Sequence, residues 1–443
     1  MNEAFLQRMQ SMLKEDYDAY LQTLNLPAYR GIRANLLKIS AEKLAERNFT
    51  ELKPSLFAPE GFYLEHDPQS LGNHIYHRQG LFYMQEPSAS SAVTILDPQP
   101  GDWVLDLCAA PGGKSTQIAS RIGHEGFLIA NEIDGGRSRI LMSNLERMGV
   151  SEALITHTSP DQFCPQLAGW MDKVLVDAPC SGEGMFKKEE MATVDWSEEH
   201  VKACSIRQRK ILDSAFETLK DQGILVYSTC TYSMEENEET VADFLNRHPE
   251  MELIDCGVTF GRPGYSVEGL DGSKVRRIFP MDQGEGHFVA KMKKNSSTGT
   301  AKRKTVKPAL LPDYVVKFLN DQLTDWSDMH FMMDQDRLMM MKHEFIQLNR
   351  IPVVRQGICV GQIVKNRLEP HHHFYISAML TERMKRTADL NEEQLQKYCS
   401  GETVQTEGQK GYVCLMYQGY PVGFGKSDGL VIKNKYPKGL RIR

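Results

Sequence analysis

Short apolar runs alternate with longer segments through the middle of the chain. Six runs of mostly apolar residues predict buried strands, at 103–107, 126–130, 153–156, 173–177, 223–227 and 287–292. Four segments between them predict helices, at 113–122, 136–148, 203–220 and 236–247. Alternation of this kind is typical of an α/β fold, in which helices cover both faces of a parallel sheet. We therefore expect one Rossmann-like domain in this part of the chain.

The pattern differs on either side of this region. Residues 1–26 place apolar side chains at helical spacing and end before Pro27, which predicts one amphipathic helix. The last segment contains short, glycine-punctuated strands typical of a small β-rich barrel. The expected divisions are an α+β subdomain, the α/β domain, a basic linker, a further unit and the β-rich barrel, at 1–80, 81–293, 294–308, 309–370 and 371–443.

Two side-chain clusters outside the α/β domain have structural interpretations. Residues 338–341 (Leu-Met-Met-Met) are expected to fill a core, as methionine runs commonly do. Three consecutive histidines, 371–373, could suggest a metal ion, but adjacent side chains do not converge well on one ion. We expect an exposed turn there, and no metal site in the protein.

Composition and cysteine usage indicate the class of protein. Hydrophobic residues make up 41% of the 443 residues and charged residues 25%, which is ordinary for a globular protein. The nine cysteines form no CxxC pair and are odd in number, so we expect reduced thiols rather than a disulfide framework or a zinc site. No run of 18 apolar residues occurs, which predicts no membrane span. A cytoplasmic protein is expected.

Charge is concentrated locally. The net charge of −6 argues against a general nucleic-acid binder. However, residues 291–307 carry seven Lys or Arg and no acid, and residues 426–443 carry six basic residues and one acid. Local basic patches bind phosphate backbones whatever the total charge. A solvated linker and a solvated tail are the alternatives.

A glycine-containing loop after the first predicted strand is a candidate cofactor site. Gly112 and Gly113 would let the backbone approach a ligand closely, and the helix that follows would offer free N–H groups to an anion. The loop matches neither GxGxxG nor the P-loop, which disfavours a dinucleotide or a phosphate. Glu132 ends the second strand, where an acid can accept both ribose hydroxyls. Together these features predict S-adenosylmethionine; for the glycine loop alone, a tight turn is the alternative.

Two cysteines follow neighbouring predicted strands. Cys180 comes after 173–177 and Cys230 after 223–227, so both would lie at the carboxyl edge of the sheet, where open α/β sheets bind ligands. A thiolate can add to C6 of a pyrimidine and make C5 nucleophilic. The reaction also needs an acid near N3 and a second group for elimination, and Cys230, Asp177 and Cys180 can fill these roles together. The alternative for either cysteine is a buried core thiol.

Four sequence motifs together resemble the Nol/Nop/Sun family of RNA cytosine-5 methyltransferases; they are LDLCAAPGGKS, VDAPCSGEG, QRKILDSAF and VYSTCTYSMEENE, within 80–292. The resemblance implies that Cys230 is the nucleophile, that Cys180 assists product release and that Asp177 lies near the flipped cytosine. It also implies a cofactor pocket lined by Cys108, Ala109, Ala110, Pro111, Gly112, Gly113, Lys114, Glu132, Arg137 and Asp177. Asp161 is a candidate for the acid near the adenine.

The layout outside the core resembles the bacterial RsmF (YebU) type, which implies a PUA-like terminal barrel and 16S rRNA or the small ribosomal subunit as partner. Three alternatives remain open: a tRNA cytosine-5 methyltransferase, a DNA cytosine-5 methyltransferase with Cys180 as nucleophile, and a catalytically silent RNA-binding assembly factor. A monomer is expected, because no long apolar seam is left over in the sequence.

Overall fold

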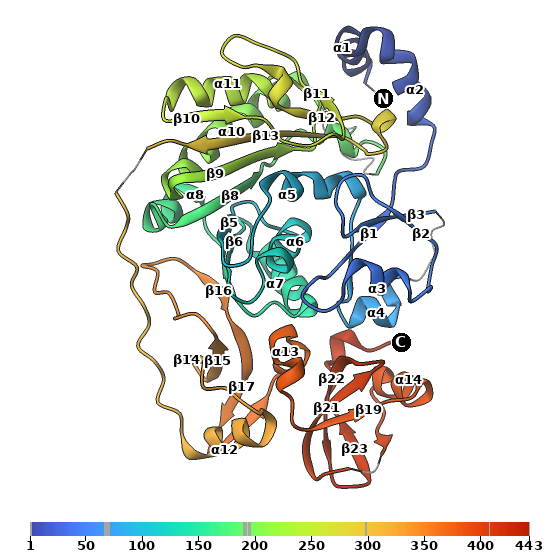
Figure 1. Ribbon diagram of the computed structural model, residues 1–443, viewed down its shortest axis with the longest axis vertical. Helices are drawn as coiled ribbons and strands as arrows, with labels where there is room; N and C mark the ends of the chain where they lie inside the picture. The colour runs from blue at the N-terminus through green and yellow to red at the C-terminus, as the bar shows by residue number, and fades with distance from the viewer. Residues whose placement is uncertain are drawn as a thin grey trace.

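A ten-stranded mixed sheet forms the centre of the computed structural model, which describes residues 2–65, 71–188, 193, 196–296, 299–406 and 408–442. The strand order is β11-β12-β13-β9-β8-β5-β6-β7-β16, with β10 paired to β13 (Figure 1). The strands are β5 (Trp103–Asp106), β6 (Phe127–Asn131), β7 (Ala153–Thr156), β8 (Met171–Asp177), β9 (Leu219–Thr229), β10 (Met251–Ile254), β11 (Arg262–Pro263), β12 (Arg276–Ile278), β13 (His287–Lys294) and β16 (Val353–Gln356). Strands β5 to β9 run parallel, which confirms the expected Rossmann-like α/β fold.

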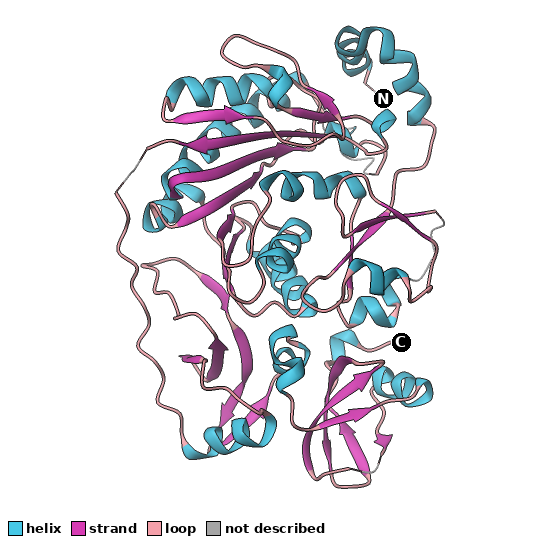
Figure 2. Ribbon diagram, in the orientation of Figure 1, coloured by secondary structure: helices cyan, strands magenta, loops and turns pink. Residues whose placement is uncertain are grey.

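Helices cover both faces of this sheet (Figure 2). They are α5 (Ser91–Leu96), α6 (Gly113–Ile122), α7 (Gly135–Met148), α8 (Pro160–Phe163), α10 (Glu198–Thr218) and α11 (Glu238–Arg247). Successive strand residues point to opposite faces, so Leu105 packs in one core cluster with α8, α10 and α11. Val104 packs in the other with α5, α6 and α7. Both residues are fully buried, which explains why these strands read as continuous apolar runs.

The N-terminal subdomain contains an antiparallel sheet of order β2-β3-β1-β4. Its elements are β1 (Gly31–Ala34), α3 (Ala41–Ala45), β2 (Leu52–Pro54), β3 (Gly61–Leu64), α4 (Ile75–Arg78) and β4 (Phe82–Met84). The single helix expected before Pro27 is two helices, α1 (Glu3–Leu13) and α2 (Tyr17–Leu24), because the chain turns at Lys14, whose φ is 50°. Short 3₁₀ helices occupy Lys14–Asp16, Leu71–Asn73, Pro87–Ser90, Cys164–Leu167, Glu183–Met185, Gly272–Lys274, Pro280–Asp282, Ala378–Arg383 and Lys438–Leu440.

The unit after the linker extends the central sheet. Its own elements are α12 (Asp313–Gln322), β14 (His330–Asp334), β15 (Arg337–Met341), β17 (Ile358–Val364) and β18 (Arg367–Pro370). Strand β16 leaves this unit and pairs antiparallel with β7, with Val353 opposite Thr156. The pairing covers what would otherwise be an open sheet edge. Residues Met339 to Met341 are buried, which confirms their expected place in a core.

A five-stranded sheet of order β19-β21-β22-β23-β20 ends the chain, consistent with the expected β-rich terminal domain. Its region contains α13 (His372–Ile376), β19 (Thr387–Asp389), α14 (Glu392–Ser400), β20 (Val404–Gln405), β21 (Gly411–Tyr417), β22 (Tyr420–Ser427) and β23 (Val431–Asn434). This domain docks on the N-terminal subdomain (Figure 1), where Gln79 Nε2 donates to the carbonyls of Tyr417 and Tyr420 at 3.0 Å. Among the described helices, none is long and apolar enough to cross a membrane.

Two further expectations differ from the structure. The linker is packed over part of its length: Arg303 lies 3.8 Å from the ring centroid of Trp103, and Trp170 Nε1 donates to the carbonyl of Ala301 at 2.7 Å. The exposed turn expected at residues 371–373 is wrong, because these residues begin α13. His373 is buried between α7 and β16, with Nε2 3.2 Å from the carbonyl of Val150.

Arg355 tests how far β16 supports the fold. Its guanidinium pairs with Glu146 of α7 and lies 3.3 Å from Nδ1 of His373, while its side chain is 9% exposed. We predict that R355A lowers the free energy of unfolding by about 2–3 kcal/mol, because Glu146 keeps most of its burial and loses its partner. The control R367A removes a surface pair with Glu369 and should cost less than about 1 kcal/mol. Urea unfolding of both variants checks this, and equal losses would contradict it.

Candidate functional site

The two cysteines expected at strand ends lie side by side. Cys180 follows β8 and Cys230 follows β9, and their Sγ atoms are 3.1 Å apart. The backbone N–H of Cys230 donates to Sγ of Cys180 at 3.3 Å. Both residues keep partial exposure, whereas Cys164, Cys204 and the other cysteines apart from Cys108 are buried. The pair is therefore the accessible thiol centre at this edge of the sheet.

The two thiols differ in their electrostatic setting. The hydrogen bond with Cys230, together with burial, raises the pKa of Cys180 well above the usual thiol range. Cys180 is therefore a neutral thiol near pH 7. A neutral thiol can donate its hydrogen to a sulfur 3.1 Å away, and such a bond stabilises a thiolate on the acceptor. Sγ of Cys230 lies at this distance from Cys180 and can accept the hydrogen of that thiol.

Asp177 connects the glycine-containing loop to the cysteine strands. Its Oδ2 lies 2.7 Å from Nζ of Lys114, and its Oδ1 accepts a hydrogen bond of 2.7 Å from Ser228 on β9. Burial is the largest single effect and lowers the pKa of Lys114. The charge and the hydrogen bond of Asp177, with smaller contributions from Cys230 and Asp106, together outweigh burial and raise this pKa overall. Lys114 is therefore a stable ammonium ion, and both oxygens of Asp177 are fixed.

The loop between β5 and α6 has open hydrogen-bonding capacity. Gly112 adopts a φ of 111°, and α6 has no side-chain N-cap, so its first N–H groups are available to a ligand. Ser115 donates to Oδ2 of Asp106 at 2.6 Å, while Oδ1 is buried and has no partner among the described residues. Burial raises the pKa of Asp106 to about 7.

Glu132 and Arg137 border the other side of the loop. Glu132 is the residue after β6, and its side chain accepts a hydrogen bond of 3.0 Å from the N–H of Asp134. Arg137 lies 3.4 Å from Glu132 and donates to the carbonyl of Ala110 at 2.9 Å. The residues predicted to line the cofactor pocket thus surround one sheet edge, at Cys108, Ala109, Ala110, Pro111, Gly112, Gly113, Lys114, Glu132, Arg137 and Asp177. Asp161 lies exposed in the first turn of α8, and its role stays a prediction.

This donor set fits S-adenosylmethionine. The free N–H groups of α6 suit a carboxylate, the unpaired oxygen of Asp106 suits an ammonium group, and Glu132 suits a ribose. Each group stands on a different element of the sheet edge. The site can therefore bind a zwitterionic amino-acid tail and a nucleoside at the same time.

Two buried acids under the cysteine loops were not assigned a role from the sequence. Glu183 accepts hydrogen bonds from Trp196 Nε1 and Ser233 Oγ on one oxygen, at 2.8 and 2.7 Å. Its other oxygen accepts from Thr231 Oγ1 and the N–H of Tyr232, both at 2.8 Å. Each loop is thereby fastened within a few residues of its cysteine.

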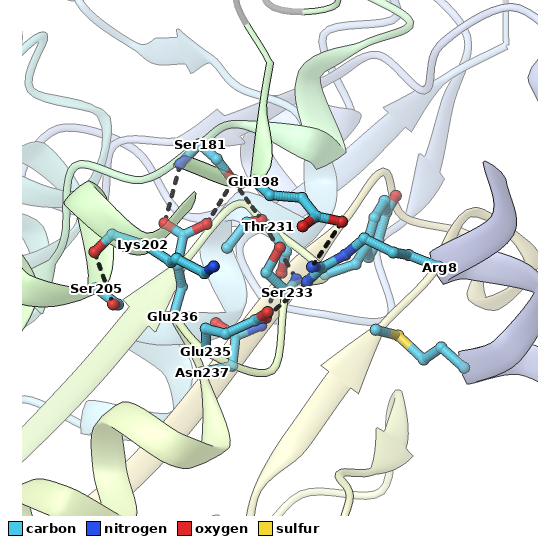
Figure 3. A network of polar contacts seen from close by, with 12 residues as sticks. Arg8, Ser181, Glu198, Lys202, Ser205, Thr231, Ser233, Glu235, Glu236 and Asn237 are labelled. Atoms are coloured by element: carbon cyan, nitrogen blue, oxygen red, sulfur yellow. Dashed lines mark hydrogen bonds and ion pairs between the residues drawn. The ribbon is translucent and has the colours of Figure 1, made fainter. Parts of the chain in front are cut away.

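Glu236 fastens the other side (Figure 3). It accepts the N–H of Ser181 at 3.0 Å and Nε2 of Gln208 at 2.8 Å, and its second oxygen contacts Ser181 Oγ. Asn237 adds a bond from its Nδ2 to the carbonyl of Thr231 at 2.9 Å. The sequence gives one signal for Glu183 and Glu236, namely that acids occur in the motif after each cysteine. The burial of these two acids depends on tertiary contacts and is not visible in the sequence.

Family models of known proteins match the chain in four successive segments. Residues 93–293 match the family model for the 16S rRNA methyltransferase RsmB/F, and residues 1–87 match the N-terminal domain of RsmF. Residues 317–377 match the first C-terminal domain of RsmF, and residues 385–442 match its PUA domain. The chain belongs to the RsmF family of rRNA methyltransferases. Members of this family depend on S-adenosylmethionine, in agreement with the fit of the loop.

Relatives cover nearly the full length. Ribosomal RNA small subunit methyltransferase F of Klebsiella pneumoniae is 31% identical, over 99% of this chain and 96% of its own length. The same enzyme of Psychromonas ingrahamii is 32% identical, with the same coverage. A methyltransferase homologue from Pyrococcus horikoshii has a TM-score of 0.60 and 31% identity, over 66% of this chain and 95% of its own. NSun6 from Pyrococcus horikoshii, solved with SFG, has a TM-score of 0.59 and 25% identity, over 67% and 99%.

Gly112→Val tests the cofactor loop. A Cβ at Gly112 would lie 3.2 Å from Cδ1 of Leu141, and its φ of 111° is unfavourable for a branched residue. We predict that G112V loses S-adenosylmethionine binding by about 100-fold or more in isothermal titration calorimetry. Gly101→Val is the matched control, because Gly101 has a φ of 90° with no neighbour within 4 Å of an added Cβ. Unchanged affinity in G112V would contradict the assignment.

Proposed function

We propose that the protein methylates C5 of a cytosine in 16S rRNA, through a covalent bond between Sγ of Cys230 and C6 of the base. The observation that carries this proposal is the pair of thiols 3.1 Å apart at the ends of β8 and β9, beside the loop that fits the cofactor. Two thiols with different roles are needed for addition and elimination, and one of them must be a thiolate.

The reaction balances as an addition, a methyl transfer and an elimination. The thiolate of Cys230 adds to C6, which makes C5 nucleophilic. Bound S-adenosylmethionine would supply an electrophilic methyl group to C5, and S-adenosylhomocysteine would be the leaving group. Loss of the C5 proton to a base and breakage of the bond between Cys230 and C6 then restore the ring and the thiolate. We assign the release of Cys230 from C6 to Cys180, and the role of the acid near N3 to Asp177, which Lys114 and Ser228 hold in place.

Assignment of the nucleophile follows from the electrostatics of the pair. In an enzyme of the DNA cytosine-5 type, the thiol in the position of Cys180 would have to ionise. The side-chain hydrogen bond with Cys230 and burial raise the pKa of Cys180. Together they outweigh the N–H bond that its sulfur accepts from Cys230, so Cys180 is a poor candidate for the thiolate. Cys230 is the better nucleophile. A tRNA target and a catalytically silent assembly factor remain as outcomes of the experiment below.

RNA contacts are proposed for the PUA domain and its basic end. The strand β22 and the residues after it carry Lys426, Lys433, Lys435, Lys438 and Arg441. Such a cluster would bind the phosphate backbone in a salt-dependent manner, and the enzyme must also take its target base out of the stack. We further propose that the enzyme acts on 16S rRNA or the small ribosomal subunit in the cytoplasm, as a monomer.

Covalent trapping tests the roles of the two cysteines. We predict that C180A accumulates protein joined to RNA in denatured cells, because the adduct forms and is not released. C230A should form no adduct and should lose methyl transfer by about 10⁴-fold or more, since removal of a nucleophile has an effect of this order. The measurement is gel electrophoresis of denatured extracts, followed by sequencing of the attached RNA. C256A, which removes a buried thiol away from the pair, is the control.

The sequence of the RNA attached to the protein identifies the substrate. Fragments of 16S rRNA would support the proposal, whereas tRNA fragments would favour the tRNA alternative. An adduct in C230A but not in C180A would exchange the two roles and favour the DNA-type mechanism. No adduct in either variant, together with no methyl transfer by the wild type, would favour an assembly factor.

A further inference from the structure

A chain of four side chains joins the two cysteine loops from below. Oε1 of Glu236 contacts Oγ of Ser181, which lies 2.8 Å from Oγ1 of Thr231, which in turn lies 2.8 Å from Oε2 of Glu183. Ser181 follows Cys180, and Thr231 follows Cys230. All four side chains belong to residues that are buried or largely buried. Figure 3 shows Ser181, Thr231 and Glu236 converging, with dashed lines between them.

The number of hydrogens in this chain determines its charge. Three oxygen–oxygen contacts link Glu236, Ser181, Thr231 and Glu183, and each contact needs one hydrogen between its two oxygens. The two hydroxyl groups supply two hydrogens, so 3 − 2 = 1 hydrogen must come from a carboxyl group. If both acids were ionised, one contact would place two lone pairs against each other in a buried site. One of the two acids is therefore protonated.

The surrounding donors decide which acid carries the hydrogen. Glu183 accepts from four donors, two on each oxygen, which is what an ionised carboxylate can accept. Glu236 accepts the N–H groups of Ser181 and Gln208 on Oε2 alone, and Oε1 faces only the Ser181 hydroxyl. This is the arrangement of a carboxylic acid, with Oε2 as the carbonyl oxygen and Oε1 as the donor.

We propose that Glu236 is a protonated carboxylic acid that donates to Ser181, and that it acts as a positioning residue for Cys180. Hydrogen bonds then run in one direction, from Glu236 through Ser181 and Thr231 to Glu183. This direction holds the residues after both cysteines, and it adds no second negative charge, besides that of Glu183, near the proposed thiolate of Cys230. The consequence for catalysis rests on the proposed function, whereas the protonation state does not.

Burial raises the pKa of Glu236 to about 7, in agreement with this direction. Four titratable groups interact electrostatically with Glu236. They are Glu183 on the 3₁₀ helix after Cys180, Cys180 itself, Cys204 on α10 and Tyr227 on β9. None of them is a cation. The hydrogen bonds from Ser181 and Gln208 lower the pKa of Glu236, but burial outweighs them. The proton should leave as pH rises through about 7.

Infrared difference spectroscopy measures the proton directly. We predict that wild type minus E236Q at pH 6 shows the C=O stretch of a protonated carboxylic acid, and that this band disappears as pH rises through about 7. E235Q is the matched control, because the neighbouring Glu235 forms an ion pair of 2.7 Å with Arg8 and is not part of the hydrogen-bonded series from Glu236 to Glu183. A spectrum of wild type minus E236Q without this band at pH 6 would overturn the proposal, whatever the reaction of the enzyme.

Adduct release measures the positioning role. A glutamine can keep every bond of a protonated Glu236, since its NH₂ group donates to Ser181 and its oxygen accepts the two N–H groups. We therefore predict that E236Q releases the RNA adduct within about threefold of the wild-type rate, while E236A slows release by about tenfold or more, as misplaced groups do. Equal losses in both variants would overturn the positioning role. If E236A does not fold, slow release in E236Q alone decides against it.

Discussion

Parallel pairing between β8 and β9 is the constraint on which the rest of the site depends. Asp177 is registered opposite Ser228, and the N–H of Ala178 donates to the carbonyl of Ser228 at 2.8 Å. Both cysteines lie two or three residues beyond this pair, so their separation is set by the sheet and not by flexible loops. A slip of one residue would move Cys180 away from Cys230 and Asp177 away from Ser228 at the same time.

Polar residues hold the chain in place once it leaves the sheet. Beyond the strand ends the backbone can no longer use ladder hydrogen bonds, and buried polar groups without partners are costly. Glu183 and Glu236 provide partners close to each cysteine, and Asn237 and the buried pair of Glu238 with Arg277 continue this support after Cys230. Glu183 and Glu236 thus hold both cysteine loops in place, and the one hydrogen that their hydroxyl partners do not supply is the one assigned to Glu236.

The sequence was sufficient for the parts of the structure that depend on local pattern. The runs at 173–177 and 223–227 predicted β8 and β9, because strands buried on both faces are continuously apolar. It was insufficient where burial comes from distant segments. Strand β16 is short and contains Arg355, and its partner β7 lies about two hundred residues earlier in the chain. The exposed turn expected at 371–373 was wrong for the same reason, since α7 and β16, which contact His373 and bury it, are distant in the sequence or form only in the folded chain.

Packing contacts connect both ends of the chain to the region of the cysteine pair and the cofactor loop. At the N-terminal end, Phe5 of α1 packs on Trp196, and Tyr20 of α2 packs on Tyr232, two residues after Cys230. At the other end, the PUA domain docks on the N-terminal subdomain through Gln79. That subdomain in turn reaches the cofactor loop, because buried Arg33 donates to the carbonyl of Gly113 at 3.0 Å. RNA held by the PUA domain would therefore be positioned relative to the cofactor loop through direct packing, without an intervening flexible linker.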